Sequence, residues 1–101
     1  MKDLKTYILE NNSTQDEDLE AEVGLALQNF GSVRKGFNWA KTEDIIDAMY
    51  NIGFDYSEGE GKDDEMIFYG EYIDTKYQII LYIKDQVKGK VKLFNFNVIE
   101  D

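Results

Sequence analysis

Three apolar runs rich in aromatic residues fill the last third of the chain, and short polar breaks separate them. The runs are MIFYGEY at 66–72, YQIILYIK at 77–84 and KVKLFNFNV at 90–98. β-Branched and aromatic side chains of this kind suit a pleated, packed surface. The breaks at 74–76 and 85–89 have the lengths and residue types of hairpin turns. The sequence therefore predicts an antiparallel meander of at least three strands.

Alternation along the last two runs assigns their side chains to the two faces of the predicted sheet. In 77–84 every second residue from the first is apolar, while the opposite face is only partly polar, as expected for a central strand. In 90–98 strict alternation places Phe94 on the same face as Phe96 and opposite Leu93. We therefore expect Phe94 to lie in the core.

Apolar residues at helical spacing predict up to three helices before the meander. The first covers 2–10 and is broken by the polar stretch at 11–13. The second and clearest covers 15–30, where apolar residues recur on one stripe. The third runs from Thr42 to about residue 51, with acidic residues in its first turn and Gly53 after its end.

These elements predict an α+β fold in a single domain, residues 1–101. Two or three N-terminal helices would pack on one face of a three- to four-stranded antiparallel sheet. Residues 54–56 could open the fourth strand, and Phe37 and Trp39 would cap an edge of the core. An exposed aromatic pair at 37 and 39 would instead indicate a binding hot spot. The predicted core residues are Leu19, Val23, Leu27, Phe30, Ile45, Met49, Ile52, Ile79, Leu81, Ile83 and Phe94.

Composition argues against an enzyme, a cofactor and a metal site. The chain has no cysteine and no histidine, so it lacks thiolate chemistry, disulfides, the usual general base and the commonest metal ligand. No serine–histidine nucleophile and no glycine-rich phosphate loop is present. We therefore predict a binding protein, with the cytoplasm as its location because no signal peptide or membrane span is visible.

The acidic stretch at 55–65 does not match a known metal motif. An EF-hand loop that began at Asp55 would need glycine at its sixth position, where the chain has Glu60. Asp55, Glu60 and Lys62 match in sequence the acid…Glu-x-Lys arrangement of metal-dependent nucleases. However, Glu60 and Lys62 fall in a glycine-spaced loop, whereas such a site needs these residues on rigid strands. A solvated acidic loop is the simpler interpretation.

Charge is the most unusual property of the chain. Twenty-one acids against eleven bases give a net charge of −10. Residues 1–75 carry eighteen acids and six bases, a net of −12, whereas 76–101 carry three acids and five bases, a net of +2. Such a field repels nucleic acids and anionic membranes and attracts basic surfaces. Lys88, Lys90 and Lys92 are too few for a nucleic-acid patch and would solvate a sheet edge. Solubility alone is the alternative explanation of the charge.

Two acidic segments are the candidate partner-binding surface. On the predicted helix 15–30, Asp16 and Glu20 are neighbours four residues apart, as are Asp18 and Glu22. Like charges at this spacing slightly destabilise a helix, so stability alone does not favour them. The candidate partner-binding residues are Asp16, Glu17, Asp18, Glu20, Glu22, Glu58, Glu60, Asp63, Asp64 and Glu65.

These observations favour an inhibitor that occupies the basic, nucleic-acid-binding surface of another protein, with carboxylates in place of phosphates. Small acidic antirestriction and anti-CRISPR proteins of phages are similar in size and charge, although no motif is shared. The first alternative is an immunity protein that neutralises a toxin such as a nuclease. The second is an acidic structural or regulatory interaction domain.

Overall fold

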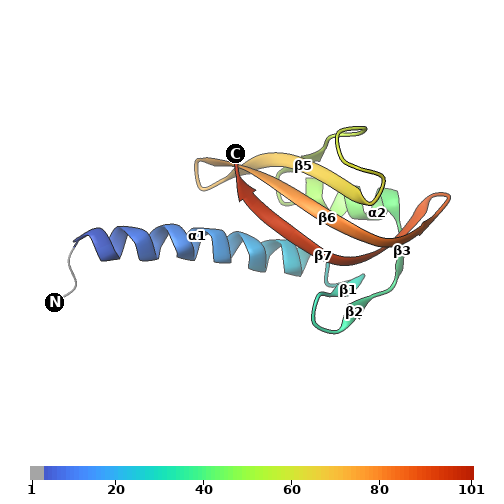
Figure 1. Cartoon of the computed structure of the whole chain (residues 1–101), viewed down its shortest axis with the longest axis horizontal. Helices are drawn as coiled ribbons and strands as arrows, with labels where there is room; N and C mark the ends of the chain where they lie inside the picture. Colours follow the sequence, from blue (N-terminus) through green and yellow to red (C-terminus); the bar gives the residue numbers. More distant parts are fainter. Residues whose placement is uncertain (1–3) are drawn as a thin grey trace.

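The computed structural model describes the backbone of residues 4–101 and the side chains of residues 15–101. Two helices and seven strands follow one another along this part of the chain (Figure 1). In chain order they are α1 (Leu4–Ala26), β1 (Gly31–Ser32), β2 (Gly36–Phe37), β3 (Trp39–Lys41), α2 (Thr42–Tyr50), β4 (Phe54–Tyr56), β5 (Glu65–Tyr72), β6 (Thr75–Val87) and β7 (Lys90–Glu100).

The main sheet has five antiparallel strands in the order β3-β7-β6-β5-β4. Its centre is the meander of β5, β6 and β7, which the apolar runs of the sequence predict. The short strands β3 and β4 pair with the outer sides of β7 and β5. Strands β1 and β2 form a separate two-stranded hairpin. Helix α2 lies behind the long strands in Figure 1, and α1 runs beside β7.

One face of this sheet and the two helices enclose the core. Residues directly opposite each other on neighbouring strands share a face, and the row Phe68, Ile79 and Val98 crosses β5, β6 and β7 in this way. The helices supply four buried side chains to the same cluster, Leu19, Val23, Ile45 and Met49, and Leu27 adds a fifth from the turn after α1. The sheet's core face completes it with Phe54, Met66, Tyr77, Leu81, Ile83, Val91 and Leu93.

The predicted fold class is wrong in its architecture. The helices do not form an N-terminal layer on a small sheet, because α2 is inserted between β3 and β4. The sheet has five strands rather than three or four, and a second sheet is present. Strand β3 is short and lies in a segment without alternation, which is why no pattern in the sequence predicts it.

The helix boundaries also differ from the prediction. The polar stretch at 11–13 lies inside the continuous helix α1, which ends at Ala26 rather than at residue 30. The predicted helix 2–10 begins at a residue outside the described part of the chain. The third predicted helix is confirmed as α2, and Gly53 follows it with a φ of 91° that favours glycine.

One predicted core residue, Phe94, is on the surface because the sheet is irregular. The pairing slips at two places, so that Lys84 on β6 and Phe94 on β7 have no directly opposite partner. A bulge of this kind inserts one residue and reverses the alternation beyond it. Val91 and Leu93 therefore share the core face with Phe96 and Val98, while Phe94 is 49% exposed.

The aromatic pair of the loop at 31–41 is divided between core and surface. Phe37 is buried, as predicted, but Trp39 is 45% exposed. Both fall on strands that flank the first part of β7, and Trp39 lies opposite Lys92 on the face turned away from the core. The prediction that Trp39 caps the core is therefore wrong.

Candidate partner-binding surface

Helix α1 carries an apolar stripe on one side and an acidic surface on the other. In its described part, Leu19 and Val23 are buried at a spacing of four residues, as one face of a helix requires. The acids between and beside them point to solvent because the stripe fixes the rotation of the helix. The exposed acids are Glu17, Asp18, Glu20 and Glu22.

Asp16 differs from the other acids of α1 because its carboxylate is engaged within the fold. The hydroxyl of Tyr77 donates a hydrogen bond to Asp16 Oδ1 over 2.6 Å. Burial and this bond raise the pKa of Tyr77 to about 12. Beside it, Gln15 Nε2 donates to the Tyr72 carbonyl oxygen and to Thr75 Oγ1, at 3.2 and 3.0 Å. These bonds tie α1 to the turn between β5 and β6.

The turn that receives α1 extends the acidic surface. Desolvation raises the pKa of Tyr72, and the negative charges of Asp18 and Glu22 raise it further. Asp74 occupies the tip of the turn with a φ of 60°, and Glu100 also acts on the pKa of Tyr77. We call the exposed acids of α1, with Asp74 and Glu100, the acidic end of the molecule.

The acidic loop at 57–64 is a second and separate surface. Its backbone is anchored to the sheet by Ser57 N–H, which donates to Ile67 O over 2.8 Å, and by Asp64 O, which accepts from Ile83 N–H over 2.8 Å. The carboxylate of Glu60 raises the pKa of the Tyr69 hydroxyl, which accepts a hydrogen bond from Gln78 Nε2 over 3.2 Å. The loop's exposed acids are Glu58, Glu60, Asp63 and Asp64, while Glu65 is half-buried at the start of β5.

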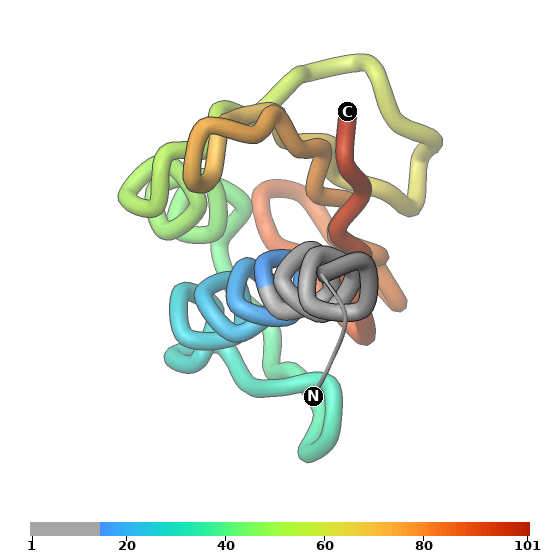
Figure 2. The backbone as a smooth tube through the Cα atoms, turned by 90° about the vertical axis from the view of Figure 1, so that its left-hand side faces the viewer, coloured from blue at the N-terminus to red at the C-terminus, as the bar shows by residue number. Residues whose placement is uncertain are grey.

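The two predicted acidic segments, on α1 and in the loop at 57–64, lie apart and do not form one surface. Figure 2 shows the loop at the top right and α1 in the centre, with the end of β7 between them. Figure 1 also separates them, since the loop joins β4 to β5 and α1 runs beside β7. A partner that covers one segment therefore meets a different part of the sheet from a partner that covers the other.

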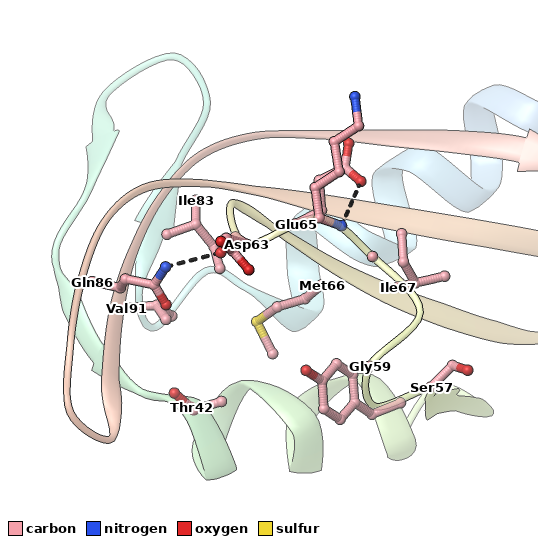
Figure 3. A pocket seen from close by; sticks show the side chains of 13 residues that line it. Thr42, Ser57, Gly59, Asp63, Glu65, Met66, Ile67, Ile83, Gln86 and Val91 are labelled. Carbon is pink, nitrogen blue, oxygen red and sulfur yellow. Dashed lines mark hydrogen bonds between the residues drawn. The ribbon is translucent and has the colours of Figure 1, made fainter.

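A cavity of about 240 Å³ lies beneath the acidic loop (Figure 3). Met66 and Ile83 form part of its wall, and Gln86 Nε2 donates to the Asp63 carbonyl oxygen over 2.8 Å at its edge. Thr42 and Ser57 add hydroxyl groups. In the part of the chain with described side chains, no three acids are grouped to hold a metal ion. The lining offers hydrogen bonds to a small polar molecule.

Sequence reasoning missed the residues that hold the acidic helix in place. Gln15 and Tyr77 both form hydrogen bonds that hold α1 against the β5–β6 turn. About sixty positions separate them in the sequence, so only the tertiary fold brings them together. One feature of the sequence could have indicated this contact. Tyr77 begins an apolar run on the core face, and a tyrosine hydroxyl that is buried there needs a hydrogen-bond partner. Asp16 is the acid that provides it.

Comparisons with protein-family models, with curated proteins and with solved structures give no match. Among the residues that the structure describes, no helix combines the length and the apolarity needed to cross a membrane.

Proposed function

We propose that the chain is a cytoplasmic inhibitor that binds the basic, nucleic-acid-binding surface of a partner protein through its acidic end. The observation that supports this proposal is the exposure of Glu17, Asp18, Glu20 and Glu22 on a helix whose opposite side is fixed in the core. The carboxylates are presented on a rigid element, so binding costs little ordering of the backbone.

Over residues 17–22 of this helix, the density of charge is close to that of duplex DNA. An α-helix rises about 1.5 Å per residue, so four exposed acids between residues 17 and 22 place roughly one charge on every 2 Å of axis. Duplex DNA carries about one charge per 1.7 Å of its axis. A surface that has evolved to bind phosphates would therefore meet a similar linear density of negative charge.

The closely spaced acids on α1 lower the stability of the helix, which a purely structural helix would avoid. Asp18 and Glu22 lie four residues apart and both raise the pKa of Tyr72, so they also repel each other. Such pairs destabilise a helix by about 0.2–0.5 kcal/mol. Asp16 has a structural role through Tyr77, whereas the exposed acids beyond it make no side-chain hydrogen bond to residues with described side chains, which leaves them available to a partner.

The test is affinity capture with the immobilised chain from a lysate of the organism that encodes it. We expect the main captured protein to be a nucleic-acid enzyme that high salt releases, because exposed charges are screened within about 8–10 Å. We also expect duplex DNA to displace it, since both ligands occupy one surface. The identity of the protein then distinguishes an inhibitor of a host defence enzyme from an immunity protein for a nuclease toxin.

Two results would contradict the proposal. One is a captured partner that is retained equally well at high salt, which would place the contact on apolar surface. The other is a salt-sensitive partner that DNA does not displace, because the acidic end would then bind outside the nucleic-acid site.

A further inference from the structure

The basic residues of this acidic chain are concentrated in two segments. Residues 31–41 and 84–92 together hold seven of the eleven bases and one of the twenty-one acids, a net charge of +6. The remaining 81 residues hold four bases and twenty acids, a net charge of −16. Strand β3 pairs with the start of β7, so the fold brings the two segments together at one end of the sheet. We call this region the basic end.

A groove of about 570 Å³ opens on the basic end, between the β1–β2 hairpin and strands β6 and β7. Lys84 and Phe94 line it, and they are the two residues left without opposite partners where the pairing of β6 and β7 slips. Bulges re-aim side chains and are common beside functional sites. Lys35 from the hairpin and Lys92 from β7 also line the groove.

The hairpin wall of the groove depends on two glycines. Gly31 has a φ of 133°, and a Cβ atom there would lie 2.3 Å from the carbonyl oxygen of Gly36. Gly36 has a φ of 93°, which also favours glycine. Ser32 Oγ accepts a hydrogen bond from Lys35 N–H over 3.0 Å, which orders the turn between the two strands. The fold therefore holds Lys35 at a defined place beside β7.

Exposed aromatic rings alternate with these lysines. Phe94 is 49% exposed and Trp39 is 45% exposed. Trp39 lies opposite Lys92 in the β3–β7 pair, and Phe94 packs against Tyr82 with ring centroids 6.1 Å apart. Basic side chains that follow a backbone, with aromatic rings on which bases stack, are the two features of surfaces that bind single-stranded nucleic acid.

The acidic end is too distant to cancel this local field. Strand β6 has thirteen residues and runs from the acidic turn at Thr75 to the basic end at Val87. At about 3.3 Å per residue it spans roughly 40 Å. The screening length at physiological salt is about 8 Å. The acids of α1 therefore contribute little to the field at the groove. The nearer acids are Asp85 on β6 and, from the acidic loop, Asp63 and Asp64, whose carbonyl oxygens accept hydrogen bonds from Gln86 and Ile83.

We propose that the basic end binds single-stranded nucleic acid, with Lys35, Lys84 and Lys92 on the phosphates and with Phe94 and Trp39 stacked on bases. This site is distinct from the acidic end and does not rest on the function proposed for that surface. An acidic peptide would use the lysines but gain little from the rings. A duplex hides the faces of its bases, so it would not use Phe94 or Trp39.

The single tryptophan provides a direct test, because Trp39 is the only one in the chain. Its fluorescence is followed while the full chain is titrated at low salt with a short oligothymidylate. We expect saturable quenching as a base stacks on the indole. Parallel titrations use thymidine monophosphate and oligoglutamate of the same length as the oligonucleotide, and we expect both to bind at least tenfold more weakly.

Two substitutions with matched controls assign the binding to the groove. Phe94→Ala should weaken oligothymidylate binding about tenfold through lost stacking, while Tyr50→Ala, at an exposed tyrosine of α2, should leave it unchanged. Lys84→Gln should lower the slope of log affinity against log salt by about 0.7, the contribution of one phosphate contact to a single strand. Lys76→Gln makes the same charge change at an exposed lysine near the acidic turn and should not alter the slope.

Three results would overturn the inference. The first is no binding of oligothymidylate at low salt by a folded protein. The second is oligoglutamate or the mononucleotide binding as tightly as the strand, which would indicate a general anion surface. The third is an equal effect of Lys76→Gln and Lys84→Gln on the salt slope, which would trace the binding to net charge. Thermal unfolding of each variant establishes that it is folded.

Discussion

At the scale of single residues, the hydrogen bond from Tyr77 to Asp16 couples the acidic helix to the sheet. The bond joins a buried phenol to a half-buried carboxylate over 2.6 Å. A hydrogen bond to a charged group contributes about 1.5–3 kcal/mol, roughly twice a neutral one. This residue pair, which the sequence does not reveal, therefore acts with the apolar stripe of α1 and the bonds of Gln15 to orient the exposed acids.

Tyr77→Phe removes the hydroxyl and retains the ring. We expect the free energy of unfolding at neutral pH to fall by about 1–2 kcal/mol, measured by chemical denaturation. Tyr50→Phe, at an exposed tyrosine, is the matched control and should have no effect.

The same variant should change the pH dependence of stability. Because the pKa of Tyr77 rises from 10.0 to about 12 on folding, the folded state retains a proton that the unfolded state loses between these values. Stability therefore falls as pH rises from 10 to 12. Tyr77→Phe lacks this contribution, so its stability should fall less steeply. An identical slope in the two proteins would show that the hydroxyl is not buried against Asp16.

At the scale of elements, the sequence predicts those with a strong period and misses those without one. The stripes of α1 and α2 and the apolar run of β6 give correct core residues, among them Val23, Met49 and Leu81. Phe94 is wrongly assigned because a single bulge shifts the alternation by one residue. Strand β3 and the β1–β2 hairpin have too few residues to show a period, and they are stabilised by neighbours distant in sequence.

The pairing of β4 with β5 requires glycine at position 70. A Cβ atom on Gly70 would lie 2.3 Å from the carbonyl oxygen of Gly53 and 2.9 Å from the ring of Phe54. Since the first contact is with backbone, Gly70→Ala should displace β4 and lower the free energy of unfolding by about 1–3 kcal/mol.

Gly24→Ala is the matched control. Apart from its chain neighbours and the backbone of its own helix, no atom lies within 4 Å of a Cβ atom at Gly24, which is exposed in α1. Alanine should therefore stabilise the protein by about 0.5–1 kcal/mol through helix propensity. Thermal unfolding of both variants measures the difference. Equal stability of the two variants would contradict the close packing of β4 against β5.

At the scale of the whole molecule, the fold places the acids of α1 at one end of the sheet and most of the bases at the other, while the acidic loop forms a separate surface on β6. The count of charges along the chain places the excess of bases after residue 76, but it cannot show that Arg34, Lys35 and Lys41 join that region. Pairing of β3 with β7 brings them there. Similarly, the acids of α1 and of the loop at 57–64 form one set in the sequence and two surfaces in the structure.

The separation of the two acidic surfaces allows them to be compared in one protein. The helix variant carries Glu17→Gln, Asp18→Asn, Glu20→Gln and Glu22→Gln, all at exposed positions, and leaves Asp16 bonded to Tyr77. The loop variant carries Glu58→Gln, Glu60→Gln, Asp63→Asn and Asp64→Asn. Both remove four negative charges, so their effects on net charge are identical.

The most direct measurement is the affinity of these two variants for the captured nucleic-acid enzyme at low salt. Exposed ion pairs contribute about 0.2–1 kcal/mol each, so we expect the helix variant to bind at least tenfold more weakly and the loop variant to lose much less. The helix variant should be as stable as the parent or slightly more stable. Equal losses in the two variants, or unchanged binding by the helix variant, would contradict the assignment of the acidic end as the partner-binding surface.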